Sequence, residues 1–248
     1  MKQLTVQAAV LLTTTTEIDR MPSTTDFNIA KVQQRIRAAE KKYLRAEHSV
    51  HLLAVTKTRP ASVIRQAAAA GLSDFGENYL QEALDKQAQL DDLNLQWHFI
   101  GPIQSNKTRA IAEHFSWVHS VDRVKIAQRL NDQRPEHLPA LNICLQLNIS
   151  AEANKSGVST ADLASLATAV AAMPRLRLRG LMAIPRASDD PEEQQAAFAL
   201  VKTAFIKLQQ THTDMDTLSM GMSKDMDAAI AEGSTMVRIG TDLFGVRA

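Results

Sequence analysis

The sequence has little cysteine, little net charge and no long hydrophobic run, and each scarcity excludes a class of protein. Its 248 residues include one cysteine, so no disulfide forms within the chain and a disulfide-stapled secreted fold is excluded. The formal net charge is only +1, which gives no support to nucleic acid as a partner. No apolar run approaches the roughly 20 residues that cross a bilayer, so we expect no membrane association.

The single cysteine, Cys144, lies in the apolar segment 141–149, where a buried strand is expected. No metal-ligand spacing surrounds it, and the sequence indicates no metal site. We interpret Cys144 as a small core side chain. A lone thiol of this kind is typical of a reducing compartment, so a cytoplasmic location is expected.

Hydrophobic residues make up 45% of the chain, enough for one large core. Residues 1–25 fit no signal peptide, because the apolar patch 8–12 is too short and no small-residue cleavage site follows. We expect 1–25 to be a disordered extension, with Met21 a candidate start codon, and 26–248 to be one domain. A monomer is expected, since no second domain buries a partner surface.

From about residue 27 the pattern alternates between helix and strand. Mostly apolar runs, typical of parallel strands buried on both faces, are predicted as strands at 50–56, 74–78, 96–101, 117–120, 141–149, 176–184, 217–220 and 236–239. Helices are predicted at 29–46, 60–70, 79–90, 106–113, 123–133, 160–173, 191–210 and 225–231. Eight strands alternating with eight helices indicate an α/β fold, a closed (β/α)8 barrel of the TIM type. No Gly-x-Gly-x-x-Gly follows the first strand, which disfavours an open dinucleotide-binding sheet.

Barrel enzymes and binding proteins build their sites at the carboxyl ends of the strands, so the residues there are the candidates. Lys57 follows the first strand in the run Ala54-Val-Thr-Lys57. A lysine at the barrel rim is partly desolvated, which lowers its pKa and readies the amine to attack an aldehyde.

A phosphate site is expected where barrels frequently have one, after strands seven and eight. Strand seven is followed by Gly221-Met-Ser223, and Ser223 is predicted to cap the next helix and to donate to a phosphate. Strand eight is followed by Gly240 and Thr241, which supply backbone N–H groups and a hydroxyl.

Arg238 alternates with Val237 and Ile239 and therefore faces the opposite side of strand eight. We interpret it as a donor to a ring nitrogen of the ligand. His98 and His119 lie beside apolar neighbours and are interpreted as core residues with satisfied polar atoms.

A lysine amine and a phosphate cradle are the two groups that hold pyridoxal 5'-phosphate (PLP), one as a Schiff base and one on the anionic tail. Three functions use this pair: a non-catalytic PLP carrier, a PLP-dependent enzyme such as an amino-acid racemase, and a Schiff-base enzyme acting on a phosphorylated sugar. An arginine on the ring nitrogen weakens electron-sink chemistry and favours the carrier, whereas it has no role in the sugar enzyme.

Seven segments in order carry a family resemblance. They are Ala54-Val-Thr-Lys57, Phe75-Gly-Glu-Asn78, Trp97-His-Phe-Ile-Gly-Pro-Ile-Gln-Ser-Asn-Lys107, Asn154-Lys-Ser-Gly157, Arg179-Gly-Leu-Met-Ala-Ile-Pro185, Leu218-Ser-Met-Gly-Met-Ser223 and Gly233-Ser-Thr-Met-Val-Arg-Ile-Gly-Thr241. Over about residues 27–248 the chain resembles the pyridoxal phosphate homeostasis protein family, which has the fold of the alanine racemase barrel domain.

The resemblance implies a Schiff base on Lys57, phosphate contacts from Ser223, Gly240 and Thr241, and Arg238 near the pyridine nitrogen. Asn78 and Met222 lie in matching motifs and are expected to line the pocket.

It also implies a regulator or carrier that acts in vitamin B6 and amino-acid balance, with no catalytic residue and with PLP-dependent apoenzymes as possible recipients. Lys224 and Asp242 depart from the family pattern and are expected to alter the charge near the phosphate. A racemase needs a second base, a tyrosine from an additional domain, and this sequence offers only Tyr43 and Tyr79, both in predicted helices.

Overall fold

The computed structural model describes residues 23–149 and 156–245. Its strands are β1 (His51–Val55), β2 (Asp74–Glu77), β3 (Gln96–Phe99), β4 (Trp117–Val121), β5 (Leu141–Gln146), β6 (Leu176–Met182), β7 (Thr217–Ser219) and β8 (Met236–Ile239). Its helices are α1 (Thr24–Lys42), α2 (Ala61–Ala69), α3 (Leu80–Gln89), α4 (Thr108–His114), α5 (Val124–Gln133), α6 (Leu163–Ala171), α7 (Pro191–Gln209), α8 (Met226–Ala231) and α9 (Thr241–Phe244).

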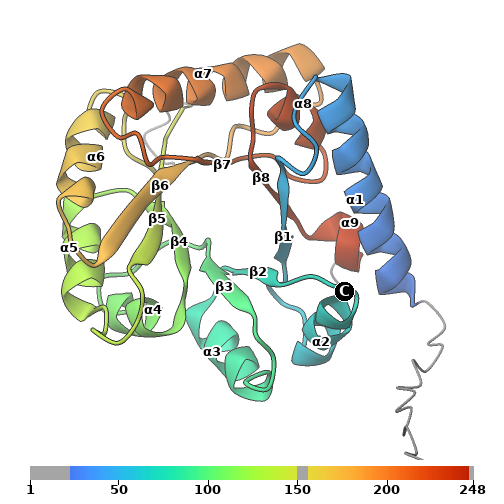
Figure 1. Ribbon diagram of the computed structural model, residues 1–248, viewed down its shortest axis with the longest axis horizontal. Coiled ribbons are helices and arrows are strands. Elements are labelled where there is room, and N and C mark those ends of the chain that lie inside the picture. The colour runs from blue at the N-terminus through green and yellow to red at the C-terminus, as the bar shows by residue number, and fades with distance from the viewer. Residues whose placement is uncertain (1–22, 150–155, 246–248) are drawn as a thin grey trace, which may run out of the picture.

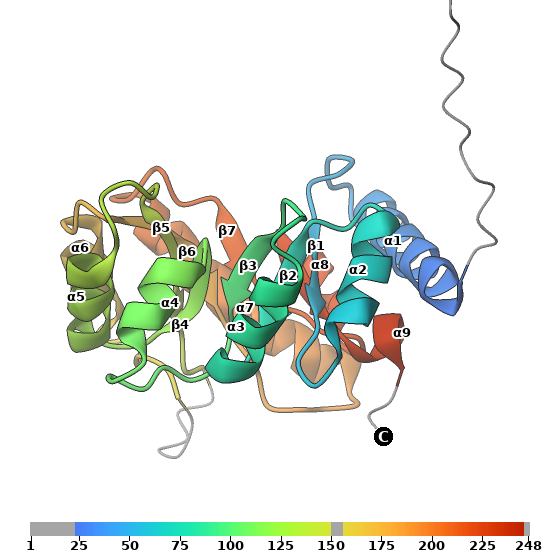
Figure 2. The ribbon, with the colours of Figure 1, turned by 90° about the horizontal axis from the view of Figure 1, so that it is seen from below.

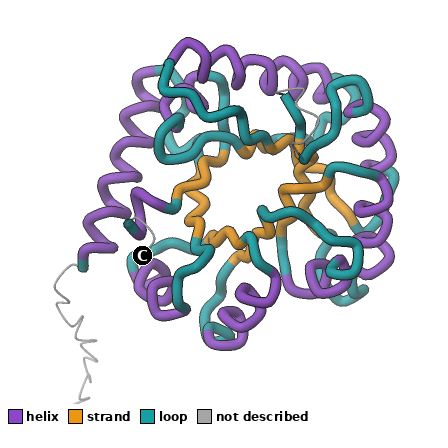
Figure 3. The backbone as a smooth tube through the Cα atoms, turned by 180° about the vertical axis from the view of Figure 1, so that it is seen from behind, coloured by secondary structure: helices purple, strands orange, loops and turns teal. Residues whose placement is uncertain are grey.

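The strands form a closed parallel barrel in chain order, surrounded by the helices (Figure 1, Figure 3). The ring closes between β1 and β8, where His51 pairs with Met236 and Ala54 with Ile239. Closure leaves no open sheet edge, and it places the carboxyl ends of all eight strands at one mouth. The predicted (β/α)8 fold is confirmed.

Apolar side chains from strands and helices make one continuous core. Phe75, Leu53 and Leu145 are fully buried in the strands, and α2 turns Ile64 and Ala67 to the barrel at helical spacing. Cys144 is also fully buried, and burial raises the pKa of its thiol to about 12, which confirms it as an unreactive core side chain.

Several element ends differ from the prediction by one to five residues, and three differences stand out. α1 begins at Thr24, five residues early, because Ser23 and Asp26 form a capping box, so its first residues fall inside the predicted extension. β5 ends at Gln146, after which Leu147 makes an isolated bridge to Val158. α9 was not predicted at all. The rest of the predicted extension, 1–22, and residues 154–155 of one motif lie outside the described residues.

The first and last helices lie side by side at one edge of the barrel (Figure 1, Figure 2). The amide of Asn28 on α1 donates to the carbonyl of Leu243 at 3.0 Å, and Arg35 pairs with Asp242 at 2.6 Å. Helix α1 therefore braces the segment that follows β8. In the described part of the chain, none of the helices combines the length and the apolar character that a bilayer span requires.

Candidate functional site

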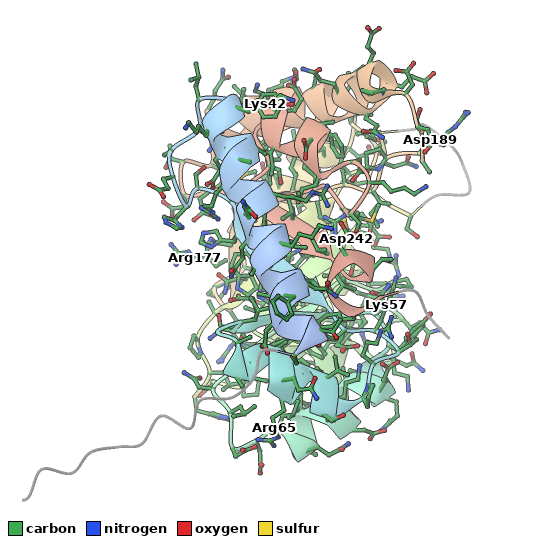
Figure 4. All side chains as sticks on the ribbon, turned by 90° about the vertical axis from the view of Figure 1, so that its right-hand side faces the viewer. Lys42, Lys57, Arg65, Arg177, Asp189 and Asp242 are labelled. Carbon is green, nitrogen blue, oxygen red and sulfur yellow. The ribbon has the colours of Figure 1, made fainter. Side chains whose placement is uncertain are left out.

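A cavity of about 710 Å³ opens at the carboxyl ends of the strands. The seven residues predicted to bind a ligand all line it: Lys57, Asn78, Met222, Ser223, Arg238, Gly240 and Thr241. Lys57, Asp189 and Asp242 lie toward this end of the barrel in Figure 4, and Arg177 lies toward the other. Residues almost two hundred positions apart in sequence thus share one site, because parallel strands bring their ends together.

The turn after β1 presents Lys57 to the cavity. Thr56 continues the strand, with its N–H donating to the carbonyl of Gly76 at 3.0 Å. Thr58 then adopts a φ of 63°, a conformation that residues other than glycine rarely adopt, and Arg59 donates its N–H back to the carbonyl of Thr56 at 3.0 Å. The tight turn fixes the direction in which the half-buried Lys57 side chain leaves the barrel rim.

A charged cluster, formed by Glu77, Glu82 and Lys86, holds the turn around Lys57 in place. The buried Lys86 ammonium lies 2.6 Å from a Glu77 oxygen and 2.5 Å from a Glu82 oxygen, and donates to the carbonyl of Thr56 at 2.8 Å. Glu82 also accepts the N–H of Thr58 at 2.5 Å. The cluster therefore holds the backbone immediately before and after Lys57.

Burial is the largest influence on Glu77 and raises the pKa of its carboxyl, against the opposing effects of Lys86 and of the Thr56 hydroxyl. The Thr56 hydroxyl donates to the same oxygen at 2.7 Å. The other Glu77 oxygen is buried without a hydrogen-bond partner among the described residues. Burying the Glu77 carboxyl therefore costs free energy, and the Lys86 ammonium is needed to offset that cost.

The loop after β7 differs in one detail from its prediction. Ser223 does not cap α8; the N-cap is Asp225, whose carboxylate accepts the N–H of Met222 at 2.5 Å. The Ser223 hydroxyl instead accepts the N–H of Asp242 at 3.4 Å and so joins this loop to α9. Gly221 has a φ of 96°, and a Cβ there would lie 2.6 Å from the Cβ of Ala229, so the loop requires glycine.

The turn after β8 runs close to the neighbouring strand. A Cβ on Gly240 would lie 3.1 Å from the carbonyl oxygen of Val55, so a larger residue would crowd the rim of the barrel. Gly240 is also the N-cap of α9, whose first residue is Thr241. Ser223, Gly240 and Thr241 therefore meet at one side of the cavity, from two loops.

The two residues expected to change the charge at this side are both paired. Asp242 forms its ion pair with Arg35, so its negative charge is compensated beside Thr241. Lys224 lies 3.8 Å from Asp189, and both side chains are exposed. An exposed pair of this kind contributes little energy, so Lys224 is a solvent-exposed positive charge at the mouth.

Arg238 faces the barrel interior and the cavity, as its alternation predicts. Arg238 is 4% exposed as a residue, and its guanidinium donates to the carbonyl of Ser219, to the Ser219 hydroxyl at 3.0 Å and to the carbonyl of Ala183 at 3.0 Å. Burial lowers its pKa to about 10, so the group stays charged at neutral pH. Among the described residues, its hydrogen bonds go only to neutral oxygens, while the carboxylate of Asp225, which also lines the cavity, acts from further away to keep the pKa of Arg238 up. A buried cation held in this way favours an electron-rich ligand in the cavity.

Asn78 and Met222 both line the wall of the cavity. The Asn78 side-chain oxygen is buried and has no hydrogen-bond partner among the described residues. Such an atom is costly unless a ligand or a water satisfies it. Met222 is 38% exposed, which leaves a flexible apolar side chain at the mouth.

Other polar strand-end residues support the site from beneath. His98 and His119 are fully buried and hydrogen-bonded, which confirms their interpretation as satisfied core residues. The Ser120 hydroxyl donates to the carbonyl of Gly101 at 2.5 Å. No group of three or more potential metal ligands occurs among residues 23–149 and 156–245.

Sequence reasoning missed Lys86, Glu82 and the connection of Arg35 to Asp242. A signal for Lys86 existed, since it lies three residues after the buried Ala83 and four before the buried Leu90, on the apolar face of α3.

Comparison with known proteins identifies the family of this chain. Residues 27–248 match the family model described as the N-terminal domain of alanine racemase. A "Pyridoxal phosphate homeostasis protein" of Pseudomonas aeruginosa is 62% identical over 225 residues, covering 91% of this chain and 96% of the relative. The chain belongs to the pyridoxal phosphate homeostasis protein family.

Two solved structures extend the comparison. PipY of Synechococcus elongatus PCC7942, solved with PLP bound, superposes with a TM-score of 0.78 at 39% identity, over 89% of this chain and 100% of PipY. An alanine racemase from Corynebacterium glutamicum is 18% identical with a TM-score of 0.66, and this chain covers 61% of it. The racemase therefore shares the barrel fold of the family, and the likeness carries nothing about activity.

Proposed function

We propose that this protein binds PLP through Lys57 and acts in PLP homeostasis and amino-acid balance as a carrier rather than as a catalyst. The observation that carries the proposal is the pairing of Lys57 with Arg238 across one cavity. One is a primary amine on a rigid turn, and the other is a buried cation whose hydrogen bonds, among the described residues, go only to neutral oxygens. The family and the PLP complex of PipY support the same ligand.

The residues of the cavity fit each part of the cofactor. The Lys57 amine would bond to the aldehyde carbon with loss of one water molecule, forming the Schiff base. Ser223, Gly240 and Thr241 would donate to the phosphate from the two loops that meet beside α9. Arg238 would donate to the ring nitrogen, and the buried Asn78 oxygen and Met222 would line the wall.

The protein's own groups favour retention over chemistry. When bound, PLP supplies an electron sink whose strength depends on protonation of its ring nitrogen. An arginine donates a hydrogen bond to that nitrogen without giving up its proton, whereas a carboxylate partner would stabilise a protonated ring. Arg238, whose pKa is still about 10 after burial, therefore keeps the sink weak.

The racemase alternative lacks its second base in this cavity. The two tyrosines of the chain, Tyr43 and Tyr79, both lie in the described part and neither lines the cavity. Turnover of an amino acid by the purified protein at a rate above that of free PLP would favour the enzyme. A sugar-phosphate Schiff-base enzyme would instead be isolated without a pyridoxyl group.

The test is intact-mass analysis after borohydride reduction, with peptide mapping of the adduct. We expect one pyridoxyl group on Lys57 and none in Lys57→Ala. Lys224→Ala is the matched control, since Lys224 also lines the cavity but is exposed and should leave the adduct unchanged. A full adduct in Lys57→Ala would overturn the assignment.

The phosphate contacts are tested by retention. Ser223→Ala and Thr241→Ala should each weaken PLP binding by about 1.5–3 kcal/mol, the value of a hydrogen bond to a charged group. Equilibrium dialysis measures the loss, and unchanged retention in both variants would remove the proposed phosphate site. We further propose that the protein is a cytoplasmic monomer that supplies PLP-dependent apoenzymes, which size-exclusion chromatography and transfer assays with an apoenzyme would check.

A further inference from the structure

A chain of hydrogen bonds crosses the barrel interior and ends at Arg238. Asp74 lies 3.0 Å from Nε2 of His98, and Nδ1 of His98 lies 3.0 Å from Nε2 of His119. Nδ1 of His119 lies 2.9 Å from the Ser219 hydroxyl, which lies 3.0 Å from the Arg238 guanidinium. We call these five residues the relay.

The relay connects the two mouths of the barrel. Asp74 is the first residue of β2, at the amino-terminal end, and its side chain is 37% exposed. His98, His119, Ser219 and Arg238 are buried in β3, β4, β7 and β8. The relay thus crosses the barrel interior from a solvent-accessible carboxylate to the wall of the cavity.

The charge of each group in the relay, and the number of hydrogens that it carries, determine which atom donates in every hydrogen bond. Burial is the largest influence on both imidazoles and lowers their pKa values, so both rings are neutral near pH 7 and each has one N–H. A carboxylate only accepts, and the pKa of Asp74 is lowered by its bonds to His98 and Ser73 despite the opposing effect of burial, so His98 carries its proton on Nε2.

The remaining bonds follow from that one. Nδ1 of His98 must accept, so His119 donates from Nε2 and its own Nδ1 accepts from the Ser219 hydroxyl. The Ser219 oxygen then accepts from Arg238, which is always a donor. All four donors point toward Asp74, and such aligned bonds strengthen one another.

We propose that the relay positions Arg238 and sets its donor pattern toward the ligand, so that Asp74 at one mouth tunes the ligand ring at the other. This inference rests on the proposed function, in which Arg238 faces the ring nitrogen. Ser219, His119, His98 and Asp74 are positioning residues, because they act through Arg238. Of the three hydrogen bonds that hold the guanidinium within the described part of the chain, only the one to the Ser219 hydroxyl involves a side chain.

The first test uses the protein without cofactor. Nitrogen NMR of the imidazoles should show both His98 and His119 as neutral Nε2–H tautomers at pH 7. An Nδ1–H tautomer on either ring would break the direction of the relay and overturn the proposal.

The second test compares two buried serines. Ser219→Ala removes the link to Arg238, whereas Ser234→Ala removes a hydroxyl that is equally buried but bonds only to backbone carbonyls of Leu218, Met220 and Met236. In the PLP-loaded protein, we expect Ser219→Ala to shift the pH midpoint of the cofactor absorbance by about one unit, the scale of one charge-assisted hydrogen bond. Ser234→Ala should change stability without that shift.

The third test changes Asp74, at the amino-terminal end of the barrel. Asp74→Ala should shift the same midpoint, and Asp74→Asn should restore it, because an amide oxygen still accepts from His98. Asp216→Ala is the matched control for Asp74→Ala, since Asp216 is also a partly exposed carboxylate with a lowered pKa, but pairs with Arg179 outside the relay.

Equal midpoints in Asp74→Ala, Ser219→Ala and their controls would overturn the proposal even if the tautomers are as expected. If the wild-type protein forms no adduct with PLP, the proposed function fails separately. The relay is then judged on the guanidinium NMR signals of Arg238 in the protein without cofactor, which must move in Ser219→Ala and Asp74→Ala and stay in place in both controls.

Discussion

Two polar networks lie beneath the same cavity, and each holds a different part of the site in place. The charged cluster of Glu77, Glu82 and Lys86 holds backbone atoms on either side of Lys57. The relay is built mainly from neutral groups and holds the side chain of Arg238. The difference teaches that one network holds the main chain on either side of the residue expected to react, whereas the other holds the head group of the residue expected to supply charge.

The largest effect should come from breaking the charged cluster. Lys86→Met leaves Glu77 buried without its cation and should lower the free energy of unfolding by about 3–5 kcal/mol. Urea unfolding measures the loss. The double variant Lys86→Met/Glu77→Leu should recover most of it, because a buried ion pair replaced on both sides by apolar groups is often neutral. A double variant no more stable than Lys86→Met alone would contradict this account.

Because His98 and His119 are buried as neutral rings, the free energy of unfolding should depend on pH. His98 and His119 have pKa values below 6.5 in the folded protein, so unfolding takes up protons once the pH falls below that value. Stability present above pH 6.5 is therefore lost on acidification, with a slope approaching about 1.4 kcal/mol per pH unit for each histidine. Urea unfolding between pH 7 and pH 5 measures the slope.

The control for this slope is His119→Asn, which should remove about one histidine's share of it. Glu77 acts in the opposite sense: its raised pKa makes its contribution fall as the pH rises above 4.5. The difference between wild type and variant isolates the relay, and equal slopes would show that His119 takes up no proton on unfolding.

A milder change tests whether charge or geometry matters in the cluster. Glu82→Gln keeps an oxygen to accept the Thr58 N–H but removes the charge, so it should cost about 1 kcal/mol, the difference between charged and neutral hydrogen bonds. The borohydride-trapped adduct on Lys57 should persist. Glu82→Ala, which loses the acceptor as well, should be less stable and slower to form the adduct; the same rate in both would exclude a positioning role for Glu82.

The smallest effect is expected at Thr58, whose φ is 63°. Thr58→Gly relieves the strain of this conformation but frees the unfolded chain, and the two contributions nearly cancel, leaving a change of about 0.5 kcal/mol or less. Thr58→Pro cannot adopt the conformation and loses the N–H to Glu82, so it should be clearly destabilised. Thermal unfolding of the pair measures both effects.

The sequence predicted those features of the fold and of the site that depend on the local pattern of residues. The strands buried on both faces read as apolar runs, and the polar residues after them marked the mouth of the barrel. α9 was missed because Thr241–Phe244 is only one turn long, and the start of α1 because the Ser23–Asp26 capping box was overlooked. The expectation that Ser223 caps α8 was wrong because the next acidic residue, Asp225, serves as its N-cap.

The two networks were beyond sequence reasoning for a physical reason. His119 and Ser219 are 100 positions apart, and their contact depends on which strands face each other across the closed ring. A pattern shows that a residue is polar and flanked by apolar neighbours. It does not show which partner satisfies it, since that is set by the three-dimensional closure of the sheet.

The bracing of the β8–α9 segment by α1 has a consequence for when the site is completed. Ser223, Gly240 and Thr241 belong to the last part of the described chain, and Arg35 and Asn28 reach Asp242 and Leu243 from its first helix. During synthesis, Lys57 leaves the ribosome long before the groups expected to hold the phosphate. A nascent chain therefore exposes the amine before the expected phosphate contacts exist, and we expect stable retention of the cofactor only after the closing residues have folded.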